Sequence, residues 1–62
     1  TGREVDVLRL VIAGCSNKAI AAELVLSPKT VERHLSSLFV RLGVADRRTL
    51  ADIGERHLAG LA

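Results

Sequence analysis

Charged and polar side chains recur on one face of the segment between Lys29 and Val40. At about 100° per residue of a helix, these residues share the side opposite the apolar ones. We call this side the outer stripe, and it consists of Lys29, Arg33 and Ser36, with Glu32 at its edge, together with the apolar Val40. Guanidinium and ammonium groups donate hydrogen bonds to phosphate oxygens and to acceptors on base edges. The chemistry available to this stripe is therefore recognition of nucleic acid.

The charged residues of the outer stripe have different expected roles, and two of them have an alternative. Arg33 can donate two parallel hydrogen bonds to guanine O6 and N7, worth about 1 to 3 kcal/mol of discrimination, or can bind a phosphate. Lys29, in the first turn, is better suited to position the helix near an anion. Glu32 can accept a hydrogen bond from cytosine N4, or pair with Lys29 for about 0.2 to 0.5 kcal/mol. His34 lies between the apolar side of the helix and the flank that carries Thr30, Ser37 and Arg41, and we favour packing over a contact with DNA.

Two further groups of polar residues can hold the nucleic-acid backbone. Their hydroxyl, amide and basic groups are suited to phosphate oxygens, and they lie on one flank of the same helix and at the start of the preceding one. They are Thr30, Ser37 and Arg41 on the flank, and Ser16, Asn17 and Lys18 at that start. Ser16 is also expected to cap its helix.

Four helices position these residues, and caps mark the first two. Thr1 and Glu4 form a Thr-x-x-Glu capping box for a helix that ends near Ala13, where Gly14 stops it. Ser16 caps the second helix, and a turn at residues 25 and 26 follows it. Helical spacing predicts the residues that face the core: Val7, Leu8, Val11, Ile12, Ile20, Ala21 and Leu24.

The third and fourth helices have equally clear signals. Ser27 is an N-cap, and the third helix runs from Pro28 to Leu42, where Gly43 ends it. Asp46 caps a fourth helix that runs toward Leu58. The predicted inward residues are Val31, Leu35, Leu38, Leu42, Leu50 and Ile53. The second and third helices, joined by a tight turn, form a helix-turn-helix, an arrangement suited to the major groove.

Composition supports an all-α fold, a compact four-helix domain. The 62 residues are enough for one domain, residues 1–62. Hydrophobic residues make up 48% of the chain, but Phe39 is the only aromatic, so aliphatic side chains must build the core. Such a composition favours helices over a sheet. The formal net charge of +2 is compatible with nucleic acid and decides little.

Several classes of function are disfavoured. The sequence has no phosphate-binding glycine loop, nucleophile elbow or paired carboxylates, so we expect no enzyme. Cys15, His34 and His57 are too far apart in sequence for a zinc site, and we expect no metal or cofactor. The chain lacks a signal peptide or long apolar run, so we expect a cytoplasmic protein without membrane contact. Because it starts at a helix cap without Met, we expect a fragment of a longer protein.

The chain resembles the C-terminal helix-turn-helix domain of LuxR-type transcription regulators, the family that contains NarL, FixJ and GerE. The resemblance covers nearly the whole chain, because the matching residues are spread over all four helices in the same order. They are Arg3, Glu4, Val7 and Leu8; Gly14, Ser16, Asn17, Lys18, Ile20 and Ala21; Leu26, Ser27, Thr30 and Val31; and Leu42, Gly43, Val44 and Arg47.

This resemblance implies sequence-specific binding of double-stranded DNA by the output domain of a transcription regulator or response regulator. The third helix would read the major groove. The chain departs from the family pattern at Ala19, where relatives are commonly acidic, and at Glu32 and Ser36, where they are often basic. We therefore do not expect a standard target sequence.

The resemblance also implies a homodimer formed by the fourth helix. We expect Ala51, Gly54 and Leu58 to face the second copy, with Gly54 allowing close approach. RNA polymerase and an N-terminal sensor or receiver domain are the further partners expected of the full-length protein. The alternative is a helical module that binds another protein and not DNA. Added salt would separate the two, because DNA binding weakens with a logarithmic slope of about −0.9 per phosphate contacted.

Overall fold

The structure, a computed structural model, describes the backbone of residues 2–61 and the side chains of residues 2–58. This part of the chain folds into four helices without strands. They are α1 (Gly2–Ile12), α2 (Asn17–Leu24), α3 (Pro28–Leu42) and α4 (Arg47–Leu61). The predicted all-α, four-helix fold is confirmed, and α4 extends three residues beyond Leu58. None of the described helices is long and apolar enough to cross a membrane.

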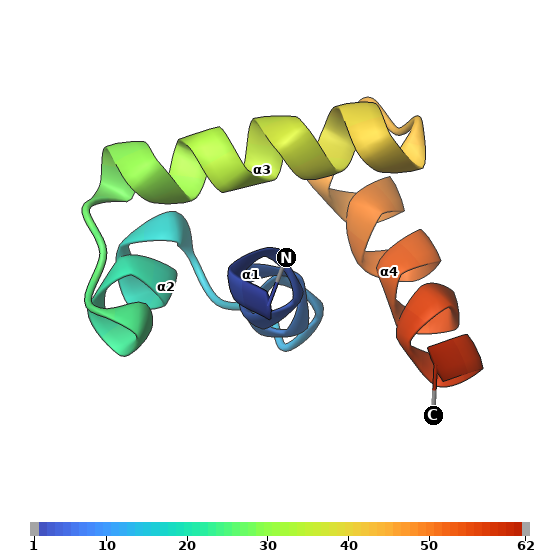
Figure 1. The fold of residues 1–62 in the computed structure, drawn as a ribbon, viewed down its shortest axis with the longest axis horizontal. Coiled ribbons are helices and arrows are strands. Elements are labelled where there is room, and N and C mark those ends of the chain that lie inside the picture. Colours follow the sequence, from blue (N-terminus) through green and yellow to red (C-terminus); the bar gives the residue numbers. More distant parts are fainter. Residues whose placement is uncertain (1, 62) are drawn as a thin grey trace.

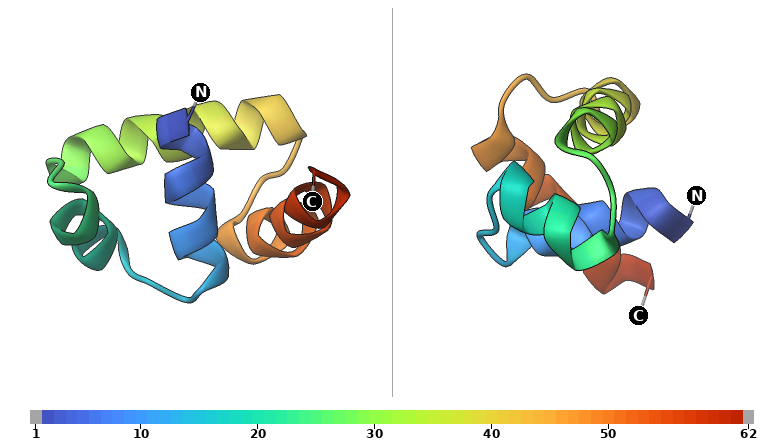
Figure 2. Two further views of the ribbon diagram at one scale, coloured as in Figure 1. Left: turned by 60° about the horizontal axis from the view of Figure 1, so that its bottom comes forward. Right: turned by 90° about the vertical axis from the view of Figure 1, so that its left-hand side faces the viewer.

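Helix α3 lies along one side of the domain, and the other three helices support it from beneath. In Figure 1, α2 lies under the N-terminal end of α3, α1 under its middle and α4 under its C-terminal end. Figure 2 shows α1 crossing α3 steeply rather than running along it. Helix α3 packs on α1, α2 and α4, and α1 also packs on α2 and α4. The side of α3 away from these helices is left uncovered.

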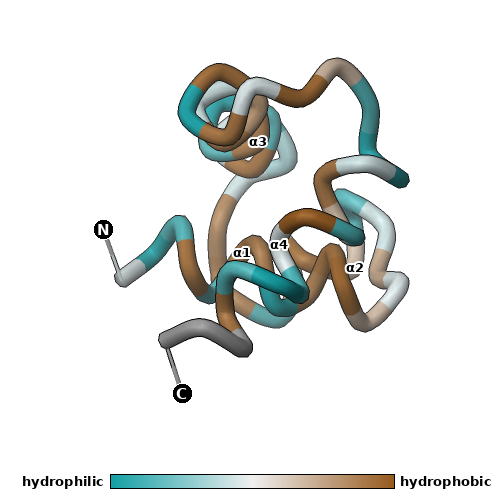
Figure 3. The backbone as a smooth tube through the Cα atoms, turned by 90° about the vertical axis from the view of Figure 1, so that its right-hand side faces the viewer, coloured by the Kyte–Doolittle hydropathy of each residue, from teal (hydrophilic) through white to brown (hydrophobic). Residues whose placement is uncertain are grey.

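The core lies where the four helices meet. Hydrophobic and hydrophilic residues alternate along each helix in Figure 3, which is typical of helices buried on one side only. The buried apolar residues are Val7, Leu8, Val11, Ile20, Ala21, Val31, Leu35, Leu38 and Leu50, all of which the sequence predicts. Leu24 and Leu42 are partly buried against this core. Ile53 was also predicted to point inward, but it is half-buried and outside the core as described.

The three predicted side-chain caps within the described residues are confirmed. Ser16 Oγ accepts from Ala19 N–H, and Ser27 Oγ accepts from Thr30 N–H, each at 3.1 Å. Asp46 Oδ1 accepts from Thr49 N–H at 2.8 Å. The hydrogen bond from the Thr49 backbone lowers the pKa of Asp46 below its usual 3.8. The predicted capping box involves Thr1, which lies outside the described residues.

Helices α1, α2 and α3 all end in a left-handed residue. At α2, Leu26 N–H donates to the Ala21 carbonyl and Val25 N–H to the Ala22 carbonyl, the two bonds of a Schellman motif. The left-handed residue is Gly14 after α1 and Gly43 after α3, with φ of 89° and 66°. At the end of α2 the position is held by Val25, with φ of 56°. A β-branched residue is unusual in this conformation.

Candidate nucleic-acid interface

The outer stripe occupies the uncovered side of α3. Lys29, Glu32, Arg33 and Ser36 are exposed, and the side chain of Val40 is 84% exposed. Among the described residues, no ion pair joins Lys29 to Glu32. One face of α3 thus presents four charged or polar side chains and one apolar side chain to solvent. The opposite face packs on the other three helices.

A shallow, open region of the surface covers the C-terminal half of α3 and is lined by Ser36, Ser37, Val40 and Arg41. Its lining combines hydroxyl and guanidinium groups with one apolar side chain. Hydrogen-bond donors beside an apolar surface can contact phosphate and base edges on one side of a groove.

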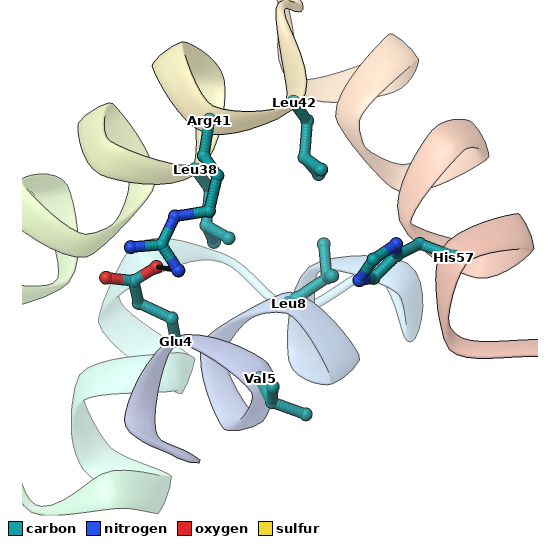
Figure 4. A pocket seen from close by; sticks show the side chains of 7 residues that line it. All are labelled: Glu4, Val5, Leu8, Leu38, Arg41, Leu42 and His57. Carbon is teal, nitrogen blue, oxygen red and sulfur yellow. Dashed lines mark ion pairs between the residues drawn. The ribbon is translucent and has the colours of Figure 1, made fainter. Parts of the chain in front are cut away.

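Glu4 of α1 contacts the flank of α3. Its carboxylate pairs with Arg41 at 3.2 Å (Figure 4). The same carboxylate accepts a hydrogen bond from Ser37 Oγ at 3.2 Å. The Glu4 side chain is 11% exposed and that of Arg41 is 59% exposed. Ser37 therefore donates its one hydroxyl proton inside the domain, whereas Arg41 has further donors that face solvent. The third flank residue, Thr30, has its hydroxyl 2.9 Å from Ser27 Oγ.

Behind this contact lies a small pocket between α1, α3 and α4. It has a volume of about 60 Å³, and Figure 4 shows His57 on its α4 side and Glu4 and Arg41 on the opposite side. Small-molecule sites are usually about 300 to 1,000 Å³, so this pocket is a packing gap. No group of His, Cys, Asp and Glu among the described side chains could hold a metal ion. His34 of α3 is half-buried.

The start of α2 is joined to α4 by a residue that the sequence-based site omitted. Arg47, the first residue of α4, donates through Nη1 to Asn17 Oδ1 and through Nη2 to the Cys15 carbonyl. Ser16 and Lys18, on either side of Asn17, are exposed. The sequence singles out Arg47 only as one of the residues that match the LuxR-type pattern, without a role in binding. Its partners are 30 and 32 residues away, so no local pattern indicates them.

The structure corrects the prediction that Gly54 faces a second copy. Gly54 is buried, and a Cβ atom at this position would lie 2.5 Å from Cδ1 of Leu8 in the same chain. The close approach that glycine permits is thus used between α4 and α1. Ala51 and Leu58 are also partly buried against the domain's own core.

Comparison with known proteins agrees with this geometry. Residues 1–53 match the family described as bacterial regulatory proteins, luxR family. Over 57 residues, 92% of this chain, the sequence is 48% identical to an HTH-type transcriptional regulator of Mycobacterium bovis. It is 53% identical over 51 residues, or 82% of the chain, to the transcriptional regulatory protein YhcZ of Bacillus subtilis. It is 47% identical over 47 residues, or 76% of the chain, to the transcriptional regulatory protein NarL of Mycobacterium tuberculosis.

These relatives are much longer than the matched region. The match spans 6% of the Mycobacterium bovis protein, 24% of YhcZ and 22% of NarL. In each of them the region similar to this chain is one part of a larger protein.

Proposed function

Because the chain belongs to the luxR family of bacterial regulatory proteins, we propose that it binds double-stranded DNA sequence-specifically. It acts as the output domain of a transcription regulator and is not an enzyme. Helix α3 enters the major groove, and its outer stripe, apart from Lys29, meets the base edges. Relatives named as transcriptional regulators support this regulatory role.

The observation that carries the proposal is the exposure of Lys29 and Arg33 on the uncovered side of α3. Val31 and Leu35 hold the opposite side in the core. A helix buried on one side and charged on the other can enter a groove without disturbing its own packing. If the other helices covered these two side chains, α3 would have no basic surface with which to contact DNA.

The other proposed contacts divide between bases and backbone. Arg33 donates to guanine, and Glu32 accepts from cytosine N4. Arg41, Thr30 and Lys29 hold phosphates from α3. Ser16, Asn17 and Lys18 hold phosphates from the start of α2. Ser37 is the weakest of the proposed contacts, because its proton is donated to Glu4.

Selection of bound duplexes from a random pool tests the partner class and the base preference together. We expect one enriched sequence whose affinity falls steeply with added salt, at a slope of about −0.9 per phosphate contacted. The alternative function is a helical module that docks on another protein through the exposed face of α3. Failure to enrich any sequence, with no binding of duplexes even in dilute buffer, would favour that alternative.

For the whole protein we propose three further partners. A second copy joins through α4, so that two α3 helices meet half-sites about 10 base pairs apart. An N-terminal sensor or receiver domain controls the activity of this output domain, and RNA polymerase is the partner through which it acts on transcription. The small share of the relatives' length that the chain matches is what motivates the N-terminal domain.

A further inference from the structure

Arg47 connects two helices that do not otherwise pack together. In the described part of the chain, the backbones of α2 and α4 do not contact each other. The Arg47 guanidinium reaches from α4 to the Asn17 carboxamide and to the Cys15 carbonyl, both at 2.5 Å. All three residues are half-buried. This one side chain therefore adds a direct link between the start of α2 and α4, which the described residues otherwise connect only through α1 and α3.

The chemistry of these groups orients the Asn17 side chain. A guanidinium only donates hydrogen bonds, so the carboxamide must turn its oxygen toward Arg47. The carboxamide is planar, with its oxygen and nitrogen on opposite sides of Cγ, so the Nδ2 group is directed away from Arg47. Among the described residues, no protein acceptor takes a hydrogen bond from Asn17 Nδ2.

We propose that Arg47 is a positioning residue for DNA binding, which holds the Asn17 carboxamide so that its N–H groups donate to a backbone phosphate. A phosphate oxygen only accepts hydrogen bonds, so it needs the nitrogen side of the amide and not the oxygen side. Without Arg47 the carboxamide is free to rotate, and the phosphate loses a pre-oriented donor. This inference rests on the proposed function, because it concerns how the same interface is assembled.

Two substitutions separate positioning from a purely structural role. Asn17→Asp keeps an oxygen for Arg47 and therefore keeps the link between the helices. It replaces the N–H donors with a second oxygen, which cannot donate to phosphate and repels it. Arg47→Lys keeps the positive charge but cannot donate to two acceptors in a fixed planar fork, so it releases the carboxamide.

The test uses the 62-residue chain and a duplex recovered from the random-pool selection. Each phosphate of one half-site is replaced in turn by an uncharged methylphosphonate, and affinity is measured for the unsubstituted chain and both variants. For the unsubstituted chain we expect one position beside α2 to cost about tenfold, the range for a hydrogen bond to a charged group. In Arg47→Lys that position should lose its effect. In Asn17→Asp the same replacement should raise affinity instead, because it removes the repulsion between the carboxylate and the phosphate. The other sensitive phosphates should keep their effects in both variants.

A purely structural role gives a different profile. Arg47→Lys would then bind every duplex more weakly by one common factor, both variants would keep the pattern of sensitive phosphates unchanged, and this result would overturn the inference. Circular dichroism checks that each variant is folded. Should Arg47→Lys fail to fold, Arg47→Gln takes its place, because its shorter amide side chain also lacks the planar fork that holds two acceptors. If the unsubstituted chain binds no duplex at all, the proposed function itself fails, an outcome distinct from an unchanged profile.

Discussion

Two neighbouring cations on α3 illustrate how residues of one charge take different roles. Arg33 has a planar fork that matches two acceptors of guanine, whereas Lys29 is a point charge in the first turn. Arg33→Ala should therefore relax the preference at one base position, at a cost of about 1 to 3 kcal/mol there. Lys29→Ala should weaken binding to all sequences alike and reduce the salt slope by about 1.

Selection from a random pool with each variant measures this difference. The two variants remove the same charge from the same face, so each is the control for the other. If Arg33→Ala left the preferred sequence untouched, Arg33 would be reassigned to phosphate contact.

The cap of α4 predicts how acid affects stability. Hydrogen bonds from Thr49 lower the folded-state pKa of Asp46 below its usual 3.8. The ionised cap therefore adds stability in full above pH 3.8, and that stability is lost as the pH falls through the lowered folded-state pKa. Asp46→Asn keeps an accepting oxygen without the titration. Thermal unfolding from pH 7 to pH 2 should show a smaller acid-side loss for Asp46→Asn, and equal losses would contradict this assignment.

At the scale of the element, α2 ends on a residue that does not suit its conformation. Val25 is left-handed and 90% exposed, whereas Gly14 and Gly43 hold the matching positions. The left-handed conformation costs an L-residue about 1 to 2 kcal/mol of stability. Because the Val25 side chain is exposed, replacing it removes little buried apolar surface. Val25→Gly should thus stabilise the domain by about 1 kcal/mol, a rise in Tm of about 4 to 8 °C.

Circular dichroism on heating measures this shift. The matched control is Gly43→Val, which puts the same side chain into the same conformation at the end of α3 and should lower the Tm. A Val25→Gly variant that melted at a lower temperature than the unsubstituted chain would show that Val25 is not strained.

What the sequence could predict depends on the range of each interaction. Caps such as Ser27 and Asp46 involve partners three residues away, so their pattern is visible in the chain itself. The core residues follow helical spacing in the same local manner. The contacts of Glu4 with Ser37 and of Arg47 with Asn17 join residues about 30 apart and depend on how the helices cross. They become visible only in three dimensions.

At the scale of the whole molecule, the corrected position of Gly54 changes which surface of α4 is available to a second copy. Leu50 is buried and Gly54 packs on Leu8, so this side of α4 belongs to the domain's own core. Ile53 is the half-buried apolar residue of α4 that lies outside that core as described. If two copies meet through α4, Ile53 is the residue we expect at the contact.

Sedimentation of the domain with DNA tests this contact. On a duplex with two half-sites about 10 base pairs apart, two copies should bind together, because both α3 helices then face the same side of the DNA. Ile53→Asn should remove the cooperativity and leave binding to a single half-site unchanged, since the outer stripe is on another helix. A misfolded variant would lose both activities, so the single half-site is the internal control. One copy per duplex at saturation, for the unsubstituted chain, would rule out dimerisation through α4.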